Sequence, residues 1–182
     1  MGIPKNAKRV FKGVIFDVYQ WEQKQFDGST KTFEMLRRKG SVEVLPIIGD
    51  KIMVVREEQP NMEERYGLVG GRQDEGESAI ASSKREMKEE TGYESNDWEL
   101  FREKKLSTKI DWTISTFIAR DCKKISEQSI DPGEKITPLL VSFDEFIHIT
   151  LDLNFRSRDL TLDILSMHYK GELEKFKRML FK

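Results

Sequence analysis

The chain has 182 residues, of which 35% are charged and 37% hydrophobic, and its formal net charge is −1. One soluble domain is expected at this length, and the near-neutral charge gives no indication of attraction to nucleic acid or membranes. The single cysteine, Cys122, excludes an internal disulfide. No apolar run in the sequence is long enough to span a bilayer, and no secretory segment opens the chain. A cytoplasmic protein is therefore expected.

The N-terminal part of the chain is expected to form β-structure. Apolar and aromatic residues alternate in part between residues 9 and 36, as in a half-buried strand. Asp27-Gly28 suits a tight turn between two strands. A hairpin of this kind buries little surface by itself. Residues 1–38 are therefore predicted to be an arm that packs on residues 39–182 or on a second subunit.

Further strands are expected at 41–48 and 51–55, joined by a turn at Gly49-Asp50. Pro46 lacks a backbone N–H, which favours an edge position or a bulge. The polar run 59–64 predicts a loop. Later strand signals lie at 98–101, 105–106, 112–119 and 136–142.

The C-terminal residues predict helices. Ser142 followed by Glu145 is the capping-box pattern, so a helix is expected from residue 143. Apolar residues at helical spacing predict a second helix at 159–167, ended by Gly171, and a third at 172–180. Strands before and after one central helix, followed by these helices, indicate an α+β fold.

The most informative stretch runs from Gly71 to Tyr93. Glu86, Glu89 and Glu90 are three and four positions apart, which places them on one side of a helix. Their like charges repel, so the cluster costs stability unless a cation neutralises it. Grouped carboxylate oxygens suit Mg²⁺ or Mn²⁺.

Glycines flank this predicted helix. Gly70-Gly71 follows an apolar run and lets the backbone approach a ligand closely. Gly92 is a good helix stop. The predicted local order is therefore strand, glycine turn, acidic helix and glycine stop.

This stretch resembles the Nudix box, whose pattern is Gly, five residues, Glu, seven residues, then Arg-Glu-apolar-any-Glu-Glu-any-Gly-apolar. Every specified position is filled, by Gly71, Glu77, Arg85, Glu86, Met87, Glu89, Glu90, Gly92 and Tyr93. A match of this length is specific. The resemblance implies the Nudix fold, an α/β/α sandwich with a mixed β-sheet, here with an N-terminal β-hairpin arm and C-terminal helices.

The resemblance also implies roles for individual residues. Glu86, Glu89, Glu90 and the carbonyl of Gly70 would bind Mg²⁺ or Mn²⁺, and Arg85 would hold the carboxylates in place. The family hydrolyses a nucleoside diphosphate linked to another group, giving a nucleoside monophosphate and a second phosphorylated product. A divalent cation neutralises and orients the phosphates and acidifies a bound water.

The general base stays open among three glutamates. In pyrophosphatases of the ADP-ribose type, the base often comes from a mobile loop before the last strand, and Glu134 has a comparable place here. Glu127, in the same loop, is the alternative. Glu89 could also activate the water itself.

Residues 33–60 resemble the branch that hydrolyses ADP-ribose and nucleoside diphosphate sugars. In that branch the arm is exchanged between subunits and helps hold the nucleobase, which implies a homodimer. Trp21, Phe26 and Phe33 are candidate stacking residues, although packing is the more ordinary role of such rings.

Three arginines, Arg37, Arg38 and Arg56, are candidate phosphate contacts, because a guanidinium binds phosphate bidentately. Exposed salt bridges are their alternative role. Departures from the branch weaken ADP-ribose as the particular substrate, since Gly67 stands where glutamate is usual, and leave other nucleoside diphosphate sugars open.

Two other functions stay as alternatives. A nucleoside triphosphate pyrophosphohydrolase is disfavoured by the N-terminal arm, which the compact triphosphate branch usually lacks. A non-catalytic nucleotide-binding regulator on the same fold is disfavoured because such proteins typically lose box carboxylates, and this chain keeps them all.

Overall fold

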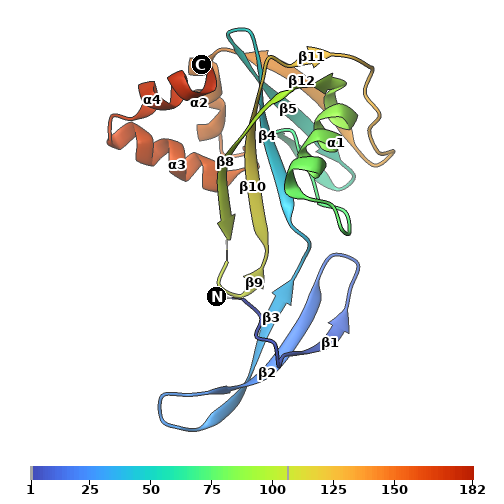
Figure 1. Ribbon diagram of the computed structural model, residues 1–182, viewed down its shortest axis with the longest axis vertical. Coiled ribbons are helices and arrows are strands. Elements are labelled where there is room, and N and C mark those ends of the chain that lie inside the picture. Colours follow the sequence, from blue (N-terminus) through green and yellow to red (C-terminus); the bar gives the residue numbers. More distant parts are fainter. Residues whose placement is uncertain (1, 106) are drawn as a thin grey trace.

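The computed structural model describes residues 2–105 and 107–182. Figure 1 shows a layered body from which a β-arm projects. The N-terminal strands form the arm, whereas the acidic helix and the C-terminal helices belong to the body. Within the described residues, no helix is long and apolar enough to cross a membrane.

The arm is a small sheet in the order β1-β2-β3-β9. Its strands are β1 (Lys8–Lys12), β2 (Asp17–Lys24), β3 (Thr30–Arg37) and β9 (Ile110–Asp111). β2 and β3 form the hairpin expected around Asp27-Gly28, where Gly28 has a φ of 82° that favours glycine. β9 pairs in parallel with β3 and ties the arm to the chain that enters the body.

The body is built on a mixed sheet in the order β12-β5-β4-β10-β8, with β6 paired to β5 off this path. Its strands are β4 (Ser41–Ile48), β5 (Lys51–Gln59), β6 (Met62–Gly67), β8 (Asp97–Lys105), β10 (Thr113–Arg120) and β12 (Lys135–Val141). β4 and β10 are parallel, and the other pairs are antiparallel. Two short strands, β7 (Tyr93–Glu94) and β11 (Lys123–Lys124), pair with each other.

Helices cover both faces of this sheet. They are α1 (Ala79–Thr91), α2 (Phe143–Leu151), α3 (Arg158–Tyr169) and α4 (Leu173–Leu180). Figure 1 shows α1 on one side and α2 to α4 on the other. Successive residues of β4 serve the two sides: Val44 packs in the cluster with Met87 of α1, and Leu45 in the cluster with Phe146 of α2. The predicted α/β/α sandwich is confirmed.

The helix ends follow their local signals. Gly92 ends α1 with a φ of 74°, and Ser142 and Glu145 form the expected capping box at the start of α2. Ser78 caps the other end of α1, where its side chain accepts a hydrogen bond from the Ala81 N–H. The glycine turn that precedes α1 and the glycine that follows it therefore fix where the acidic helix lies.

Two local predictions were wrong. Residues 59–64 form a hairpin between β5 and β6, with Asn61 at a φ of 63°, because these strands tolerate polar residues on their exposed side. The edge position predicted for Pro46 is wrong, because β4 is an interior strand. β4 pairs with β5 only at Ile47 and Ile48, so Pro46 lies just beyond that ladder. Of the strand expected at 105–106, Lys105 ends β8, and Leu106 lies outside the described residues.

Candidate active site

Three carboxylates of the box, Glu86, Glu89 and Glu90, line a cleft of about 950 Å³, a size typical of small-molecule sites. Its walls come from α1, the glycine turn, the loop before β12 and the loop before α3, and its outer end reaches the arm. Predicted site residues that line it are Arg38, Gly70, Arg85, Glu86, Glu89, Glu90 and Glu134. The fold therefore brings together residues from distant parts of the chain.

Glu90 is the most enclosed of the box carboxylates, with 6% of the residue exposed. Its Oε2 accepts a hydrogen bond from the Gly70 N–H at 2.8 Å. Burial nevertheless raises the pKa of Glu90 to about 8, because this one bond offsets only part of the desolvation cost. Burial also raises the pKa of Glu86. The protein therefore compensates the ionised form of these carboxylates only in part, and a bound cation would favour that form.

The glycine turn fits closely against this cluster. Gly70 has a φ of 140°, which an L side chain rarely adopts. A Cβ atom at Gly71 would lie 2.6 Å from Glu86 Oε1. Gly70 therefore requires glycine for its conformation, whereas a side chain at Gly71 would displace the Glu86 carboxylate.

Arg85 holds the cluster from within α1. Its Nη1 donates to Glu86 Oε1 and to Glu89 Oε2, each at 2.9 Å. Its Nη2 donates to Glu77 Oε2 at 3.1 Å, and this hydrogen bonding is the main cause of the lowered pKa of Glu77. Such a network supports the role predicted for Arg85, which is to orient the carboxylates.

The donor set fits a hard divalent cation in its chemistry, because it consists of carboxylate oxygens with uncompensated charge. In the conformations seen within residues 2–105 and 107–182, no three acidic, histidine or cysteine side chains converge to hold a metal ion. Glu86 and Glu89 instead turn to Arg85. The carboxylates share one cleft, and binding an ion would require them to change rotamers.

The loop before β12 contributes an acid to the same cleft. Glu134 Oε1 accepts a hydrogen bond from Gln59 Nε2 at 3.0 Å. Burial, and next the charge of Glu57, raises the pKa of Glu134. In contrast, the side chain of Glu127 is 90% exposed and pairs with Lys124, and it does not line the cleft.

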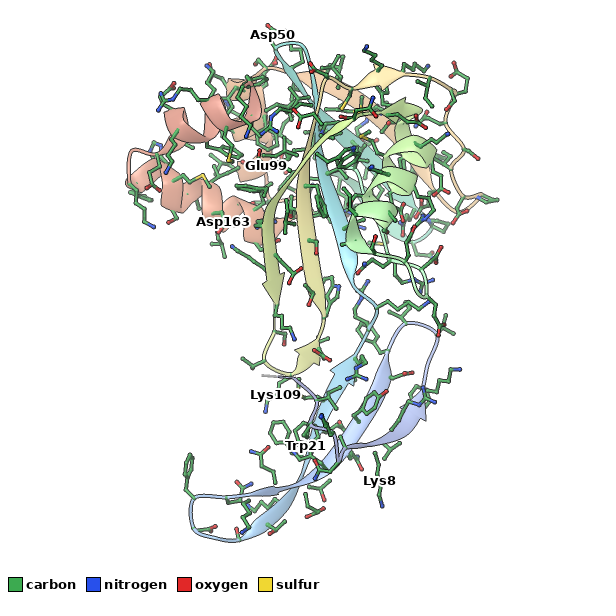
Figure 2. All side chains as sticks on the ribbon, in the orientation of Figure 1. Lys8, Trp21, Asp50, Glu99, Lys109 and Asp163 are labelled. Carbon is green, nitrogen blue, oxygen red and sulfur yellow. The ribbon has the colours of Figure 1, made fainter. Side chains whose placement is uncertain are left out.

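Several predicted substrate residues lie elsewhere in this single chain. Trp21 packs on Phe33 with ring centroids 4.9 Å apart, and Phe26 is fully exposed at the hairpin tip. Arg37 pairs with Asp111 at 3.2 Å, and Arg56 with Glu64 at 3.3 Å. Figure 2 shows Trp21 on the arm, away from α1. A role for these side chains at the cleft would require another subunit, and it stays a prediction.

The sequence did not point to two cleft residues, Arg156 and Glu57. Arg156 Nη1 donates to Glu57 Oε2 at 2.6 Å, and its Nη2 donates to the Leu68 carbonyl at 2.7 Å. Arg156 lies in the loop before α3, where no local pattern marks it. Strand alternation could have found Glu57, because it shares the buried face of Met53 and Val55 in β5.

Comparison with known proteins agrees with this site. A family model described as NUDIX domain matches residues 37–163. The chain therefore belongs to the Nudix family, as the box predicted. The Escherichia coli (strain K12) protein described as ADP compounds hydrolase NudE is 30% identical over 95 residues, which cover 50% of this chain and 51% of that protein. The chain thus spans about half the length of the curated relative it matches.

A solved structure described as that of an ADP compounds hydrolase shares the fold. Its TM-score is 0.72 at 22% identity, with 92% of this chain and 94% of that chain covered. Because the coverage includes nearly the whole chain, the likeness extends beyond the body to most of the arm and the C-terminal helices.

Proposed function

We propose that this chain hydrolyses the diphosphate linkage of a nucleoside diphosphate joined to another group, such as a sugar or ribose. The products are a nucleoside monophosphate and a sugar phosphate. The observation that carries the proposal is that Glu86, Glu89 and Glu90 line one cleft with the glycine turn and Glu134. The description of two similar proteins as ADP compounds hydrolases supports an ADP-containing substrate.

A divalent ion, Mg²⁺ or Mn²⁺, belongs to this proposal. Glu86, Glu89, Glu90 and the Gly70 carbonyl would hold it, and when bound it would neutralise phosphate charge and acidify a water. Arg85 keeps two of these carboxylates oriented. Glu134 would accept the proton of the attacking water, a role supported by its raised pKa and its place in the cleft.

The test is incubation with Mg²⁺ and a panel of ADP-ribose, nucleoside diphosphate sugars and nucleoside triphosphates, followed by identification of the products. Release of a nucleoside monophosphate and a sugar phosphate is the expected result. Hydrolysis of triphosphates alone would favour the pyrophosphohydrolase alternative, and tight binding without hydrolysis would favour a regulator. Glu86→Gln should abolish turnover, whereas Glu75→Gln, an exposed acid that does not line the cleft, should not.

Dimerisation through the arm is also proposed. The arm exposes large apolar side chains, among them Val10, Phe11, Val14 and Ile15, and a surface of this kind suits a protein interface. Ile15 and Phe16 also line the outer end of the cleft. A dimer in sedimentation at micromolar concentration is expected, and a monomer would count against the proposal. The cytoplasmic location stays a prediction.

A further inference from the structure

A glutamine at the end of β5 bridges two acids of the cleft. Gln59 is the last residue of this strand, and it lines the cleft together with Glu57 and Glu134. Its Nε2 donates to Glu57 Oε1 at 2.7 Å and to Glu134 Oε1 at 3.0 Å. An amide nitrogen has two hydrogens and an ionised carboxylate only accepts, so both hydrogens of this side chain are used on carboxylates. Gln59 therefore ties the sheet to the loop that carries Glu134.

One end of this bridge is firmly held. Glu57 is only 2% exposed, and it also accepts hydrogen bonds from Arg65 Nη2 at 3.3 Å and from Arg156 Nη1 at 2.6 Å. A buried carboxylate with three donors has little freedom to change its orientation. The amide that faces Glu134 is therefore fixed from the side of the sheet.

The other end of the bridge depends on it. Across the part of the chain that the structure describes, Gln59 is the one side chain that donates to the Glu134 carboxylate. The preceding residues 131–133 are exposed, and a Cβ atom at Gly133 would meet no atom within 4 Å. The neighbouring loop therefore provides little packing that could orient this carboxylate.

The bridge is neutral, which matters because of the charges around Glu134. Glu57, Asp131 and Arg156 act on this carboxylate, and it acts in turn on Glu86. Burial first, and then the charge of Glu57, raises the pKa of Glu134. A cationic donor in place of the amide would favour the ionised form more strongly and lower this pKa. The amide thus orients the carboxylate while leaving it able to accept a proton.

We propose that Gln59 is a positioning residue, which holds the Glu134 carboxylate in the cleft so that it can accept the proton of the attacking water. The proposal rests on the proposed function, in which Glu134 is the general base. An oriented base contributes to the chemical step and not to the binding of substrate. Loss of the bridge should therefore lower kcat and leave KM nearly unchanged.

The kinetic test uses Gln59→Met, which keeps a similar side-chain volume and removes both donors. With Mg²⁺ and the substrate of the panel that is hydrolysed fastest, kcat should fall about tenfold, which is part of the contribution of a general base. KM should stay within about twofold. In a Glu134→Gln background, Gln59→Met should cause no further fall, because the base it orients is already absent. Glu58→Met is the matched control, since Glu58 is exposed on the same strand, pairs with Lys135 and does not line the cleft.

A second measurement tests the bridge without activity. Nitrogen NMR of the metal-free protein in EDTA should show the Gln59 side-chain amide signal moving with pH as Glu134 gains its proton, and Gln59→Met identifies this signal by its loss. In Glu134→Gln this movement should largely disappear. Arg65 and Arg156 still hold Glu57 in Gln59→Met, so the fold should persist, and a thermal melt checks this.

The positioning role would be overturned by unchanged kcat in Gln59→Met, by a further fall in the double variant, or by an amide signal that does not respond to Glu134. An increase in KM that persists without Glu134 would also overturn it, because Gln59 would then contact the substrate itself. If the wild-type chain hydrolysed none of the panel, the proposed function would fail and this role with it. Active wild-type enzyme with an unaffected Gln59→Met variant would reject the positioning role alone.

Discussion

Two buried glutamates on opposite faces of the central sheet differ in how their charge is compensated. On the face covered by α3, Glu43 accepts hydrogen bonds from Arg102 at 3.1 Å and from Thr116 at 3.0 Å. On the face covered by α1, Glu90 has a single partner in the Gly70 N–H, and its pKa is raised to about 8. A compensated acid is part of the structure, whereas an uncompensated one is free to bind a ligand.

The contrast extends to the arginines. Arg102 also lies 2.6 Å from Asp159 and 2.8 Å from Asp163, which Figure 2 shows on the helical side of the body. Arg120, only 3% exposed, donates to the carbonyls of Met179 and Leu180 and so anchors the end of α4. Within residues 2–105 and 107–182, Arg38 and Arg72 have no such acidic partners. The helical layer around Arg102 therefore pairs its buried charges, whereas the cleft combines paired groups such as Arg85 and Arg156 with the weakly compensated Glu90.

The largest effect is expected where pairing is complete. Arg102→Met would leave Glu43, Asp159 and Asp163 without their shared cation, and stranding buried charge in this way costs about 3–5 kcal/mol. Urea unfolding should show a loss of this size in the free energy of unfolding. Arg9→Met, which breaks an exposed pair with Asp17, is the control and should change stability little. A loss below about 1 kcal/mol for Arg102→Met would contradict the supporting role.

Replacing Glu90 in the cleft should have the opposite effect and stabilise the metal-free protein. Glu90 has a folded-state pKa of about 8, above its ordinary value of 4.5. Its protonated form favours folding, so this contribution is present below pH 4.5 and is lost as the pH rises through 8. Glu90→Gln has no proton to lose and keeps the Gly70 hydrogen bond. At pH 8, the metal-free variant should therefore be more stable than the wild type by about 4 kcal/mol.

This prediction is measured by denaturant unfolding in EDTA at pH 5 and pH 8. The gap between variant and wild type should be small at pH 5 and large at pH 8, and Mg²⁺ should stabilise the wild type more than the variant. Hydrolysis should fall sharply in the variant at both values. Equal stabilities at pH 8 would show that Glu90 carries no uncompensated charge.

The sequence predicted features that depend on a few adjacent residues. The Ser142 and Glu145 capping box, the Gly92 helix stop and the Asp27-Gly28 turn all form as expected, because each is a local hydrogen-bonding or backbone preference. The box likewise placed its carboxylates on one helix. The preferences of a few adjacent residues were therefore sufficient to predict these features.

Features that depend on distant residues were not predictable in this way. Arg156 reaches the Gly70 turn from 86 positions further along the chain, and no nearby pattern indicates it. β4 can hold Pro46 in the interior of the sheet because β5 pairs with β4 only at Ile47 and Ile48 and diverges from it before those residues. Arg38 and Arg72 share the cleft only because the arm brings Arg38 to the glycine turn. All three features depend on tertiary packing between residues that are distant in the sequence.

A third, intermediate effect should separate the candidate bases. Glu134 lies in the cleft and Glu127 outside it, although both belong to one loop. Glu134→Gln should lower kcat by about 10²-fold, a typical contribution of general-base catalysis. Its affinity for Mn²⁺, measured by titration, should change little. Glu127→Gln should retain turnover, and the reverse result would assign the base to Glu127. Loss in neither variant would favour Glu89.

The smallest effect is expected at the surface of the supporting layer. Glu99 has a lowered pKa, caused first by its hydrogen bond from Lys182 and then by that from Arg120. Its stabilising contribution is therefore present above its ordinary value of 4.5 and is lost as the pH falls through the lowered value. Because the pair is largely exposed, Lys182→Ala should cost at most about 1 kcal/mol at pH 7. Thermal melts should show this difference shrinking as the pH falls through that lowered value, since protonated Glu99 no longer attracts the lysine. If the stability lost in Lys182→Ala persisted at low pH, Lys182 would stabilise the protein by packing and not by its charge. The charged residues on the outside of this layer would then differ from the paired residues in its interior.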